Sequence, residues 1–138
     1  MDELKQLLKI NKLKATPIRL AILDFIKNSS TPLNELDLRS LLNKSFKNKM
    51  TKSTLYREFK TLSQLSLIKE LVFKDGIRRY EFGNHHCHHL ICSNCSTVTH
   101  LVLEKDLEKL EAKIKRNTNF KISFHTLEFY GLCPSCSL

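Results

Sequence analysis

The first 65 residues carry apolar side chains at every third or fourth position, which is the spacing of amphipathic helices. This pattern predicts helices over residues 2–12 and 17–28, a third helix that opens at Thr31-Pro32, and a fourth that is capped by Thr51. Thr followed by Pro favours a helix start, because Thr caps the N-terminus and Pro fits the first turn. We expect the apolar faces of these helices to form one core.

From residue 67 the pattern changes to that of β-strands. Two β-prone runs, 67–73 and 77–82, flank Lys74-Asp75-Gly76, and Asp-Gly between such runs favours a hairpin. Helices followed by a hairpin are typical of a winged helix-turn-helix, whose last helix enters the major groove of DNA. Residues 1–83 are therefore predicted to form a winged-helix DNA-binding domain.

A second domain is predicted for residues 84–138. It begins with an extended histidine-rich stretch, and the segments 97–102 and 120–130 are also strand-like, whereas 104–116 has the apolar face of a helix. The order strand, strand, helix, strand describes a small α/β unit whose last strand returns near its first. The predicted fold class of the whole chain is α+β.

The positive charge is concentrated in the first of these domains. The 138 residues carry a net charge of +9; residues 1–83 have 17 Lys and Arg against 9 Asp and Glu, and residues 84–138 have 6 against 5. This asymmetry favours a polyanion-binding half joined to a half with another task. The alternative is a generally basic protein, which would spread its charge evenly.

Composition excludes several other classes of protein. A content of 41% hydrophobic and 27% charged residues, with 3 Gly and 3 Pro, is typical of globular chains. There is no apolar run of the roughly 18 residues that span a membrane, and the N-terminus does not resemble a secretion signal. Five cysteines, four of them at C-x-x-C spacing, favour a reducing compartment, so we expect a cytoplasmic protein.

The fourth predicted helix offers a candidate DNA-binding face. Its Leu and Phe positions use the inner side, which leaves a polar and basic face outward. We expect Tyr56 and Arg57 to contact bases and phosphates, and the flanking lysines to contact phosphates. The predicted contacts on this helix are Lys52, Ser53, Thr54, Tyr56, Arg57 and Lys60. The alternative is a solvated charged face on an ordinary helical domain.

Two C-x-x-C pairs form the strongest chemical signal. Cys92 and Cys95 are separated from Cys133 and Cys136 by about 38 residues, and each pair can place two thiolates on one tetrahedral ion. Four thiolates leave no open position for a substrate, so the predicted zinc site is structural and ties the start of the second domain to its end. The alternative is two unrelated redox or surface pairs.

The residues between Asn84 and Cys95 include four of the six histidines and three of the five cysteines. Alternate residues of an extended strand face opposite sides. Cys87 and His89 should therefore face one side and His86 and His88 the other, so one strand can serve two further metal sites.

Taken together, these motifs resemble those of the ferric uptake regulator (Fur) family of metal-dependent bacterial repressors. The resemblance rests on motifs that cover nearly the whole chain in the family's order: Lys14-x-Thr16-x-x-Arg19, Ser53-Thr54-Leu55-Tyr56-Arg57, Tyr80-Glu81-Phe82, the His-His-Cys-His-His-Leu-Ile-Cys-x-x-Cys cluster, and His125 to Cys136. It implies a homodimer with a winged helix on each side and a C-terminal dimerisation domain. A regulatory metal would fix the two winged helices in a DNA-binding geometry on a palindromic operator.

The resemblance also implies roles for individual residues. The structural zinc ligands would be Cys92, Cys95, Cys133 and Cys136. The metal-sensing site would be Glu81, Cys87, His89 and His100. A further site in the dimerisation domain would be His86, His88, Glu108 and His125. The positions matching DNA contacts are Lys14, Arg19, Tyr56 and Arg57.

Departures from the family pattern bear on the sensed metal. Many members supply a sensing His at the start of the third helix, where this chain has Thr31-Pro32. Cys87 stands where His is usual, and His100 stands where a carboxylate is usual. One carboxylate, one thiolate and two imidazoles suit tetrahedral zinc better than ferrous iron. The sequence therefore favours a zinc-responsive regulator, with an iron- or peroxide-responsive member as the alternative.

Two alternatives belong to other classes of protein. A thiol oxidoreductase or zinc hydrolase would need an open metal position with an acid or nucleophile beside it, and the sequence shows no such arrangement. A zinc-stapled interaction adaptor would have no preference for DNA sequence. We expect neither an enzyme nor a small-molecule substrate.

Overall fold

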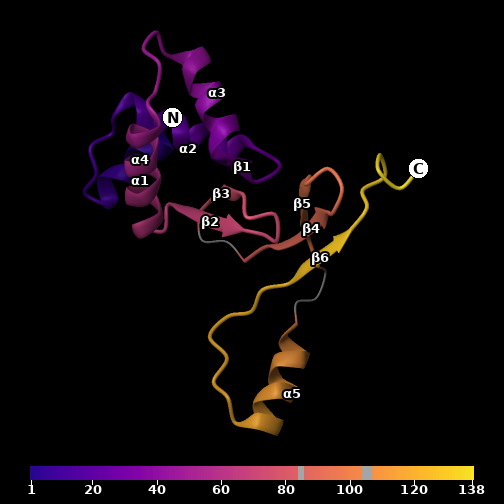
Figure 1. Ribbon diagram of the computed structural model, residues 1–138. Coiled ribbons are helices and arrows are strands. Elements are labelled where there is room, and N and C mark those ends of the chain that lie inside the picture. The colour runs from indigo at the N-terminus through magenta and orange to yellow at the C-terminus, as the bar shows by residue number, and fades with distance from the viewer. Residues whose placement is uncertain (84–85, 104–106) are drawn as a thin grey trace. The chain divides into compact units, whose positions relative to one another are not determined.

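The structure is a computed structural model that describes residues 1–83, 86–103 and 107–138. The chain divides into two compact units, Met1–His85 and His86–Leu138 (Figure 1). The predicted boundary at residues 83–84 lies two residues from this division, and Asn84 itself lies outside the described residues. Each unit is considered separately below.

The first unit begins with helices at the places that the apolar pattern predicts. Within residues 1–83 the helices are α1 (Asp2–Ile10), α2 (Pro17–Asn28), α3 (Glu35–Ser45) and α4 (Lys52–Gln64). The Thr16 hydroxyl accepts from the Arg19 N–H, and the Thr51 hydroxyl accepts from the Thr54 N–H. Both threonines therefore cap their helices as expected.

The predicted start of the third helix at Thr31-Pro32 is wrong. Leu33–Asn34 forms a short strand, β1, which pairs with Tyr80 and Arg79, and α3 begins at Glu35. The Asn34 side chain caps α3 by accepting from the Asp37 N–H at 2.8 Å. Asn is a better N-cap than the Thr-Pro pair upstream in this setting, because the paired strand holds the intervening residues extended.

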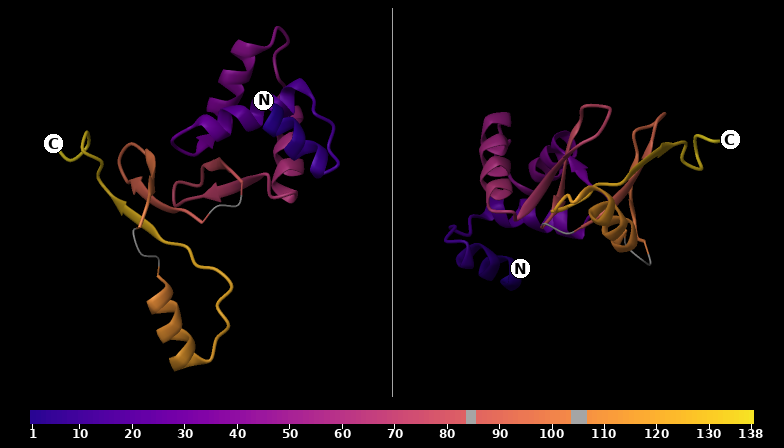
Figure 2. Two further views of the ribbon diagram at one scale, coloured as in Figure 1. Left: turned by 180° about the vertical axis from the view of Figure 1, so that it is seen from behind. Right: turned by 90° about the horizontal axis from the view of Figure 1, so that it is seen from below.

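The hairpin of the first unit is the predicted wing. β2 (Ile68–Val72) and β3 (Arg78–Phe82) are antiparallel neighbours, and the sheet order is β1-β3-β2. Gly76 has a φ of +72°, a conformation that suits glycine, in the turn between them. Buried residues of all four helices and of the hairpin form one core, in which the rings of Phe59 and Tyr80 lie 4.4 Å apart. Figure 2 shows the helices gathered at this sheet from two other sides.

The turn of the wing is fixed by a buried cation. The guanidinium of Arg79 donates to both carboxylate oxygens of Asp75, at 3.1 and 2.7 Å, and lies 5.6 Å from the Phe73 ring centroid. Arg79 is 5% exposed. A planar guanidinium suits this geometry because it forms a two-pronged bond with a carboxylate while stacking on a ring.

The second unit is built on a mixed sheet of order β5-β4-β6, with β4 (His88–Cys92), β5 (Val98–Leu101) and β6 (Glu128–Gly131). β4 pairs antiparallel with β5 and parallel with β6, so the last strand returns to the first as predicted. The helix is α5 (Glu108–Thr118); the first residues of the predicted helix, 104–106, lie outside the described residues.

The predicted strand over residues 120–130 is largely wrong. Among residues 107–138, strand structure is confined to Glu128–Gly131, because only these residues pair with β4. Within α5, all of whose residues are described, none is buried, although its apolar positions follow helical spacing. The second unit therefore leaves apolar groups on its surface. None of the helices in the described part of the chain has the length and apolar content needed to cross a membrane.

The buried Tyr80 makes a pH-dependent contribution to stability. Burial, reinforced by Glu70, raises the pKa of its hydroxyl from 10 to about 12. The unfolded chain therefore loses this proton first, and stability present below pH 10 is lost as the pH rises towards 12. Relative to Tyr80→Phe, the wild-type protein should lose about 1.4 kcal/mol of unfolding free energy between pH 9 and pH 11.

Urea denaturation at both pH values measures this difference. A wild-type minus Tyr80→Phe difference that stays constant with pH would contradict the prediction.

Candidate metal centres and nucleic-acid interface

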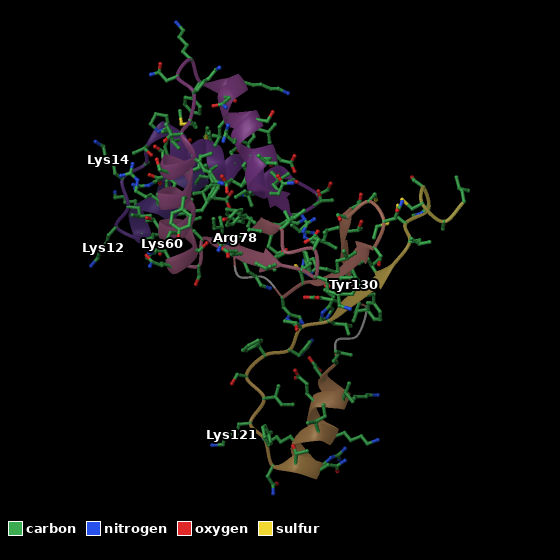
Figure 3. The ribbon with its side chains drawn as sticks, in the orientation of Figure 1. Lys12, Lys14, Lys60, Arg78, Lys121 and Tyr130 are labelled. Atoms are coloured by element: carbon green, nitrogen blue, oxygen red, sulfur yellow. The ribbon has the colours of Figure 1, made fainter. Side chains whose placement is uncertain are left out.

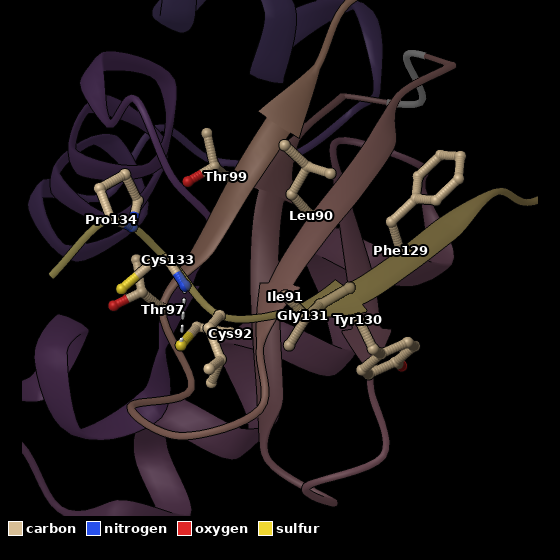
Figure 4. A pocket seen from close by; sticks show the side chains of 11 residues that line it. Leu90, Ile91, Cys92, Thr97, Thr99, Phe129, Tyr130, Gly131, Cys133 and Pro134 are labelled. Carbon is tan, nitrogen blue, oxygen red and sulfur yellow. Dashed lines mark hydrogen bonds between the residues drawn. The ribbon is translucent and has the colours of Figure 1, made fainter. Parts of the chain in front are cut away.

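The four-cysteine site follows from the parallel pairing of β4 and β6. Parallel strands end at the same edge of a sheet, and each of these two strands runs into a C-x-x-C turn. The Ser93 N–H donates to the Gly131 carbonyl at 2.7 Å, and the Cys133 N–H donates to Cys92 Sγ at 3.4 Å. Figure 4 shows this last contact as a dashed line. The pairing thus brings together turns that lie about 38 residues apart.

The geometry of the sulfurs fits zinc. The ligand atoms of Cys92, Cys95, Cys133 and Cys136 all lie within 4.8 Å of one another, and Cys95 Sγ lies 3.7 Å from Cys133 Sγ. Tetrahedral zinc–sulfur bonds of about 2.3 Å require sulfurs roughly 3.8 Å apart. The predicted four-thiolate set is therefore assembled, and it can hold zinc with no open position.

Two of these thiols have pKa values that depart in opposite directions. Backbone N–H groups, first those of Cys95 and Cys133, lower the pKa of the Cys92 thiol to about 6. For Cys136, donation from the Asn94 amide lowers the pKa of the thiol. The neighbouring sulfurs of Cys133 and Cys95 together outweigh this effect and raise the pKa to about 11. Sulfurs this close disfavour one another's ionisation, and a bound divalent cation reverses that effect.

A cluster of three histidines forms a second group in the same unit. His86 Nε2 lies 2.9 Å from His125 Nε2, and the ligand atoms of His86, His88 and His125 all lie within 4.8 Å of one another. His125 Nδ1 lies 2.5 Å from Glu111 Oε1. A carboxylate on the outer nitrogen of a metal-binding imidazole fixes the ring's tautomer and orientation.

The acidic residue that contacts this cluster in the structure is Glu111. Glu108, the predicted ligand, is exposed in the first turn of α5 and is not among the converging residues of the described chain. Glu111, one helical turn further on, contacts His125 and was missed. The available signal was the spacing of the two acids, because residues three apart share a helix face.

Part of the predicted sensing site lies within the second unit. His89 and His100 are direct neighbours on β4 and β5, and their ring centroids are 5.4 Å apart. His89 is buried, and Cys87, two residues earlier, is partly buried. Glu81, the remaining predicted ligand, belongs to β3 of the first unit, where it is buried with Lys69 Nζ 3.6 Å from its Oε1.

The fourth helix presents the predicted nucleic-acid face. Leu55, Phe59 and Leu62 are buried, whereas the predicted contacts lie on the outer side; Lys52, Ser53, Tyr56, Arg57 and Lys60 are exposed, and Thr54 is partly buried. The first turn of α4 contains no acidic residue, so its N-terminus favours phosphate. Figure 3 shows the side chains of Lys12, Lys14 and Lys60 extending from the first unit.

The wing adds a cationic residue that the sequence analysis missed. Arg78 is exposed on β3 and lines a groove of about 440 Å³ together with Lys52 and Tyr56 of α4. Its alternation with the buried Arg79 was the available signal, because successive strand residues face opposite sides. The wing and the fourth helix thus border one basic groove.

The predicted contact Arg19 has a partner within the protein. Its Nε donates to Glu58 Oε2 at 2.7 Å, and its Nη1 donates to the Lys14 carbonyl at 3.0 Å. The Arg19 and Glu58 side chains are 18% and 19% exposed. Arg19 therefore attaches the loop that carries Lys14 to α4, and this fixes the spacing between two parts of the predicted DNA face.

A winged helix with a basic face, joined to a sheet that assembles four thiols and two groups of histidines, defines a class: metal-responsive DNA-binding regulators. Comparison with known proteins identifies the family within this class. The profile of the ferric uptake regulator family matches residues 10–130, and the chain belongs to that family. The α+β fold predicted from the sequence is confirmed by the structures it resembles.

Individual relatives support the same assignment. The chain is 33% identical to the peroxide operon regulator of Bacillus subtilis (strain 168), over 99% of this chain and 93% of that protein. It resembles the structure of the Helicobacter pylori ferric uptake regulator with a TM-score of 0.83, 22% identity and coverage of 99% and 91% of the two chains. A zinc-bound manganese uptake regulator gives a TM-score of 0.75, 28% identity and coverage of 94% and 98%.

Members of this family are metal-responsive transcriptional regulators that bind DNA, and the chain is one of them. Relatives named for peroxide, iron and manganese show that the signal differs between members of the family. The choice among these signals therefore depends on this chain's own ligands.

The four-cysteine site should be needed for the stability of the second unit. Cys136→Ser should lower the bound zinc by one ion per chain and lower the melting temperature, because a small unit with few buried residues depends on its metal. Elemental analysis and thermal denaturation measure both effects. Ser135→Ala is the matched control, since Ser135 is exposed in the same C-x-x-C turn but lies outside the four-sulfur group; loss of the same zinc in this variant would contradict the assignment.

The Arg19–Glu58 ion pair should stabilise the first unit. Glu58→Gln should cost about 1–3 kcal/mol of unfolding free energy, because the partly buried guanidinium loses a charged partner. Glu3→Gln breaks the exposed pair between Lys27 and Glu3 and should leave stability almost unchanged. Urea denaturation compares the two variants, and equal effects would show that the Arg19 pair has no structural role.

Proposed function

We propose that the chain is a zinc-responsive transcriptional repressor that acts as a homodimer. The observation that carries this proposal is the pairing of His89 with His100 on adjacent strands, with the Cys87 thiol two residues before His89. Imidazole and thiolate together favour zinc over the harder divalent ions, which prefer oxygen ligands.

The proposed sensing ligands are Glu81, Cys87, His89 and His100. They would hold an ion through one carboxylate, one thiolate and two imidazoles, and zinc accepts four such ligands in tetrahedral geometry. The His86, His88 and His125 cluster would hold a further ion, with Glu111 orienting His125. When bound, these ions supply positive charge and fixed geometry, and no redox chemistry is needed.

The sensing ligands suggest how metal controls the DNA-binding unit. Glu81 lies near the end of β3, the last strand of the wing, whereas Cys87, His89 and His100 belong to the second unit. Ligation by residues of both units would cross-link them and restrict the orientations of the winged helix. Metal would then act through a higher affinity for one conformation than for others.

The exposed apolar surface of the second unit supports a homodimer. Leu110 of α5 and the aromatic side chains of Phe120 and Phe124 are exposed. Residues 120–127 alternate as a strand does, yet strand structure in this part of the chain begins only at Glu128. A strand-like segment beside exposed apolar groups is suited to contact with a second copy of the chain.

The DNA interface proposed for each protomer centres on α4. Lys52, Ser53, Thr54, Tyr56, Arg57 and Lys60 would face the major groove and its phosphates, with Lys14 on the backbone and Arg19 holding Lys14 in place. A two-fold dimer reads a palindromic operator, one half-site per winged helix. Phosphate contacts by these cations would make binding fall steeply with salt.

The second candidate is an iron- or peroxide-responsive regulator, and it is supported by a specific observation. The relative that shares 33% of its residues with this chain is a peroxide operon regulator. On this alternative, ferrous iron would occupy the sensing site, and peroxide would release the protein from DNA. Operator binding across buffered zinc and iron series, with and without peroxide, separates the two candidates.

The sensing assignment predicts the behaviour of a double variant. Cys87→Ser with His89→Ala should abolish zinc-dependent operator binding, measured by fluorescence anisotropy at fixed salt, because two of four ligands are lost. The zinc of the four-cysteine site should remain at one ion per chain. Arg57→Ala serves as a comparison: it should weaken binding at every zinc concentration without shifting the zinc midpoint.

The outcome that would contradict the assignment is full zinc-dependent binding by the double variant. Zinc-independent binding of wild type would instead contradict the proposed function as a whole.

A further inference from the structure

β6 places a carboxylate beside the paired histidines of the second unit. In the register of the sheet, His89 of β4 is the neighbour of His100 on β5 and of Glu128 on β6. The His89 N–H donates to the Leu127 carbonyl at 3.2 Å, which is consistent with this register. Residues 100, 89 and 128 therefore form one row across three strands.

These three side chains lie on the same face of the sheet. Figure 4 shows Leu90 and Phe129 on one side of the strands and Tyr130 on the other side of β6. Because alternate residues share a face, Glu128 lies on the side of Tyr130, and His89 lies on the side opposite to Leu90. In-register neighbours on adjacent strands share a face, so the carboxylate of Glu128 is on the histidine side.

The distances permit a shared ion. Neighbouring strands lie about 4.8 Å apart, and the His89 and His100 rings are already 5.4 Å apart. A glutamate side chain is long enough to bring a carboxylate oxygen to an ion held by the adjacent imidazole. The Tyr130 hydroxyl donates to Glu128 Oε2 at 2.7 Å, and this is how outer groups orient the carboxylate ligands of metals.

From this row we propose that Glu128 is a further ligand of the sensed ion, and that Tyr130 is its positioning residue. The inference deepens the proposed function and rests on it, because it concerns the ion held by His89 and His100. A second carboxylate would raise the number of ligands from four to five and add a hard oxygen donor. Glu128 would thereby supply a fifth ligand in a chain that has Thr31-Pro32 where many family members have a further sensing His.

The added oxygen has a consequence for metal selectivity. Zinc is satisfied by four ligands, whereas manganese and ferrous ions gain more from carboxylate oxygen and higher coordination. Glu128 should therefore widen the range of metal ions that the site binds, so that it accepts Mn²⁺ and Fe²⁺ more readily than a four-ligand site would. Removing this carboxylate should raise the selectivity of the site for Zn²⁺ over Mn²⁺ and Fe²⁺.

The test compares Glu128→Gln with the parent protein, both carrying His86→Ala so that the three-histidine cluster is disabled. Glu128 is exposed on β6, and retention of one zinc per chain at the four cysteines reports intact folding. Mn²⁺ and Zn²⁺ affinities are measured by competition with a chelator, and Co²⁺ is used as an absorbing probe. Glu128→Gln should weaken Mn²⁺ binding about tenfold or more and Zn²⁺ binding much less.

The absorption spectrum of bound Co²⁺ reports the coordination geometry of the ion. This spectrum would not change if Glu128 only supported the fold. In Glu128→Gln it should become more intense, because four-coordinate cobalt absorbs more strongly than five-coordinate cobalt. Tyr130→Phe should shift both readouts in the same direction by a smaller amount. Asp2→Asn, which also removes one exposed carboxylate but lies in the first unit, should change neither readout.

The outcomes separate this inference from the proposed function. Unchanged Mn²⁺ affinity and an unchanged cobalt spectrum in Glu128→Gln would overturn the inference, while metal-dependent operator binding by wild type would still support the proposed function. If wild-type protein bound no cobalt beyond the four-cysteine site, both would be overturned.

Discussion

The parallel pairing of β4 with β6 is the constraint on which the second unit depends. This single ladder brings the ends of two distant strands to one edge of the sheet, where their C-x-x-C turns can share an ion. The same register places His89 between His100 and Glu128. Since the described part of the unit buries few apolar side chains and none from α5, bound metal would supply order that a larger core supplies in other domains.

The two units are stabilised in different ways. The first has a continuous apolar core drawn from its four described helices and its hairpin, so its DNA-binding face should keep its shape with or without metal. The second carries its candidate metal ligands largely on its strands, and β4 presents different groups on its opposite faces because side chains alternate. A regulator with this division can respond to metal in one unit without unfolding the unit that reads DNA.

Much of this arrangement could be predicted from the sequence, because the signals were local. Thr16 and Thr51 cap helices, Asp75-Gly76 turns the hairpin, and the C-x-x-C spacing identifies a metal site. The sequence predictions failed where contacts between distant segments decide the bounds of a helix or strand. α3 begins late because β1 pairs with β3 and Asn34 takes the cap. The ladder with β4 begins only at Glu128, so residues 120–127 do not form a strand. Spacing signals existed for Glu111 and Arg78, but spacing alone does not say which side chains meet in space. The engagement of Arg19 by Glu58 is a contact between distant residues and had no such signal. The individual ligand and DNA-contact assignments stay predictions, and for the four cysteines the structure shows that the sulfurs lie close enough to share an ion.

The buried guanidinium of the wing has a consequence for recognition. Arg79 holds Asp75 from within the hairpin, so the turn at Gly76 is ordered by the protein's own contacts. A flexible wing would lose conformational entropy on docking and would adapt to many backbones. A wing ordered beforehand avoids most of that entropic cost, and it fits best where the width of the neighbouring groove already matches its shape. If the hairpin docks on DNA as a wing does, its fixed conformation would favour sites of matching groove shape and would add selectivity at base pairs that no side chain contacts.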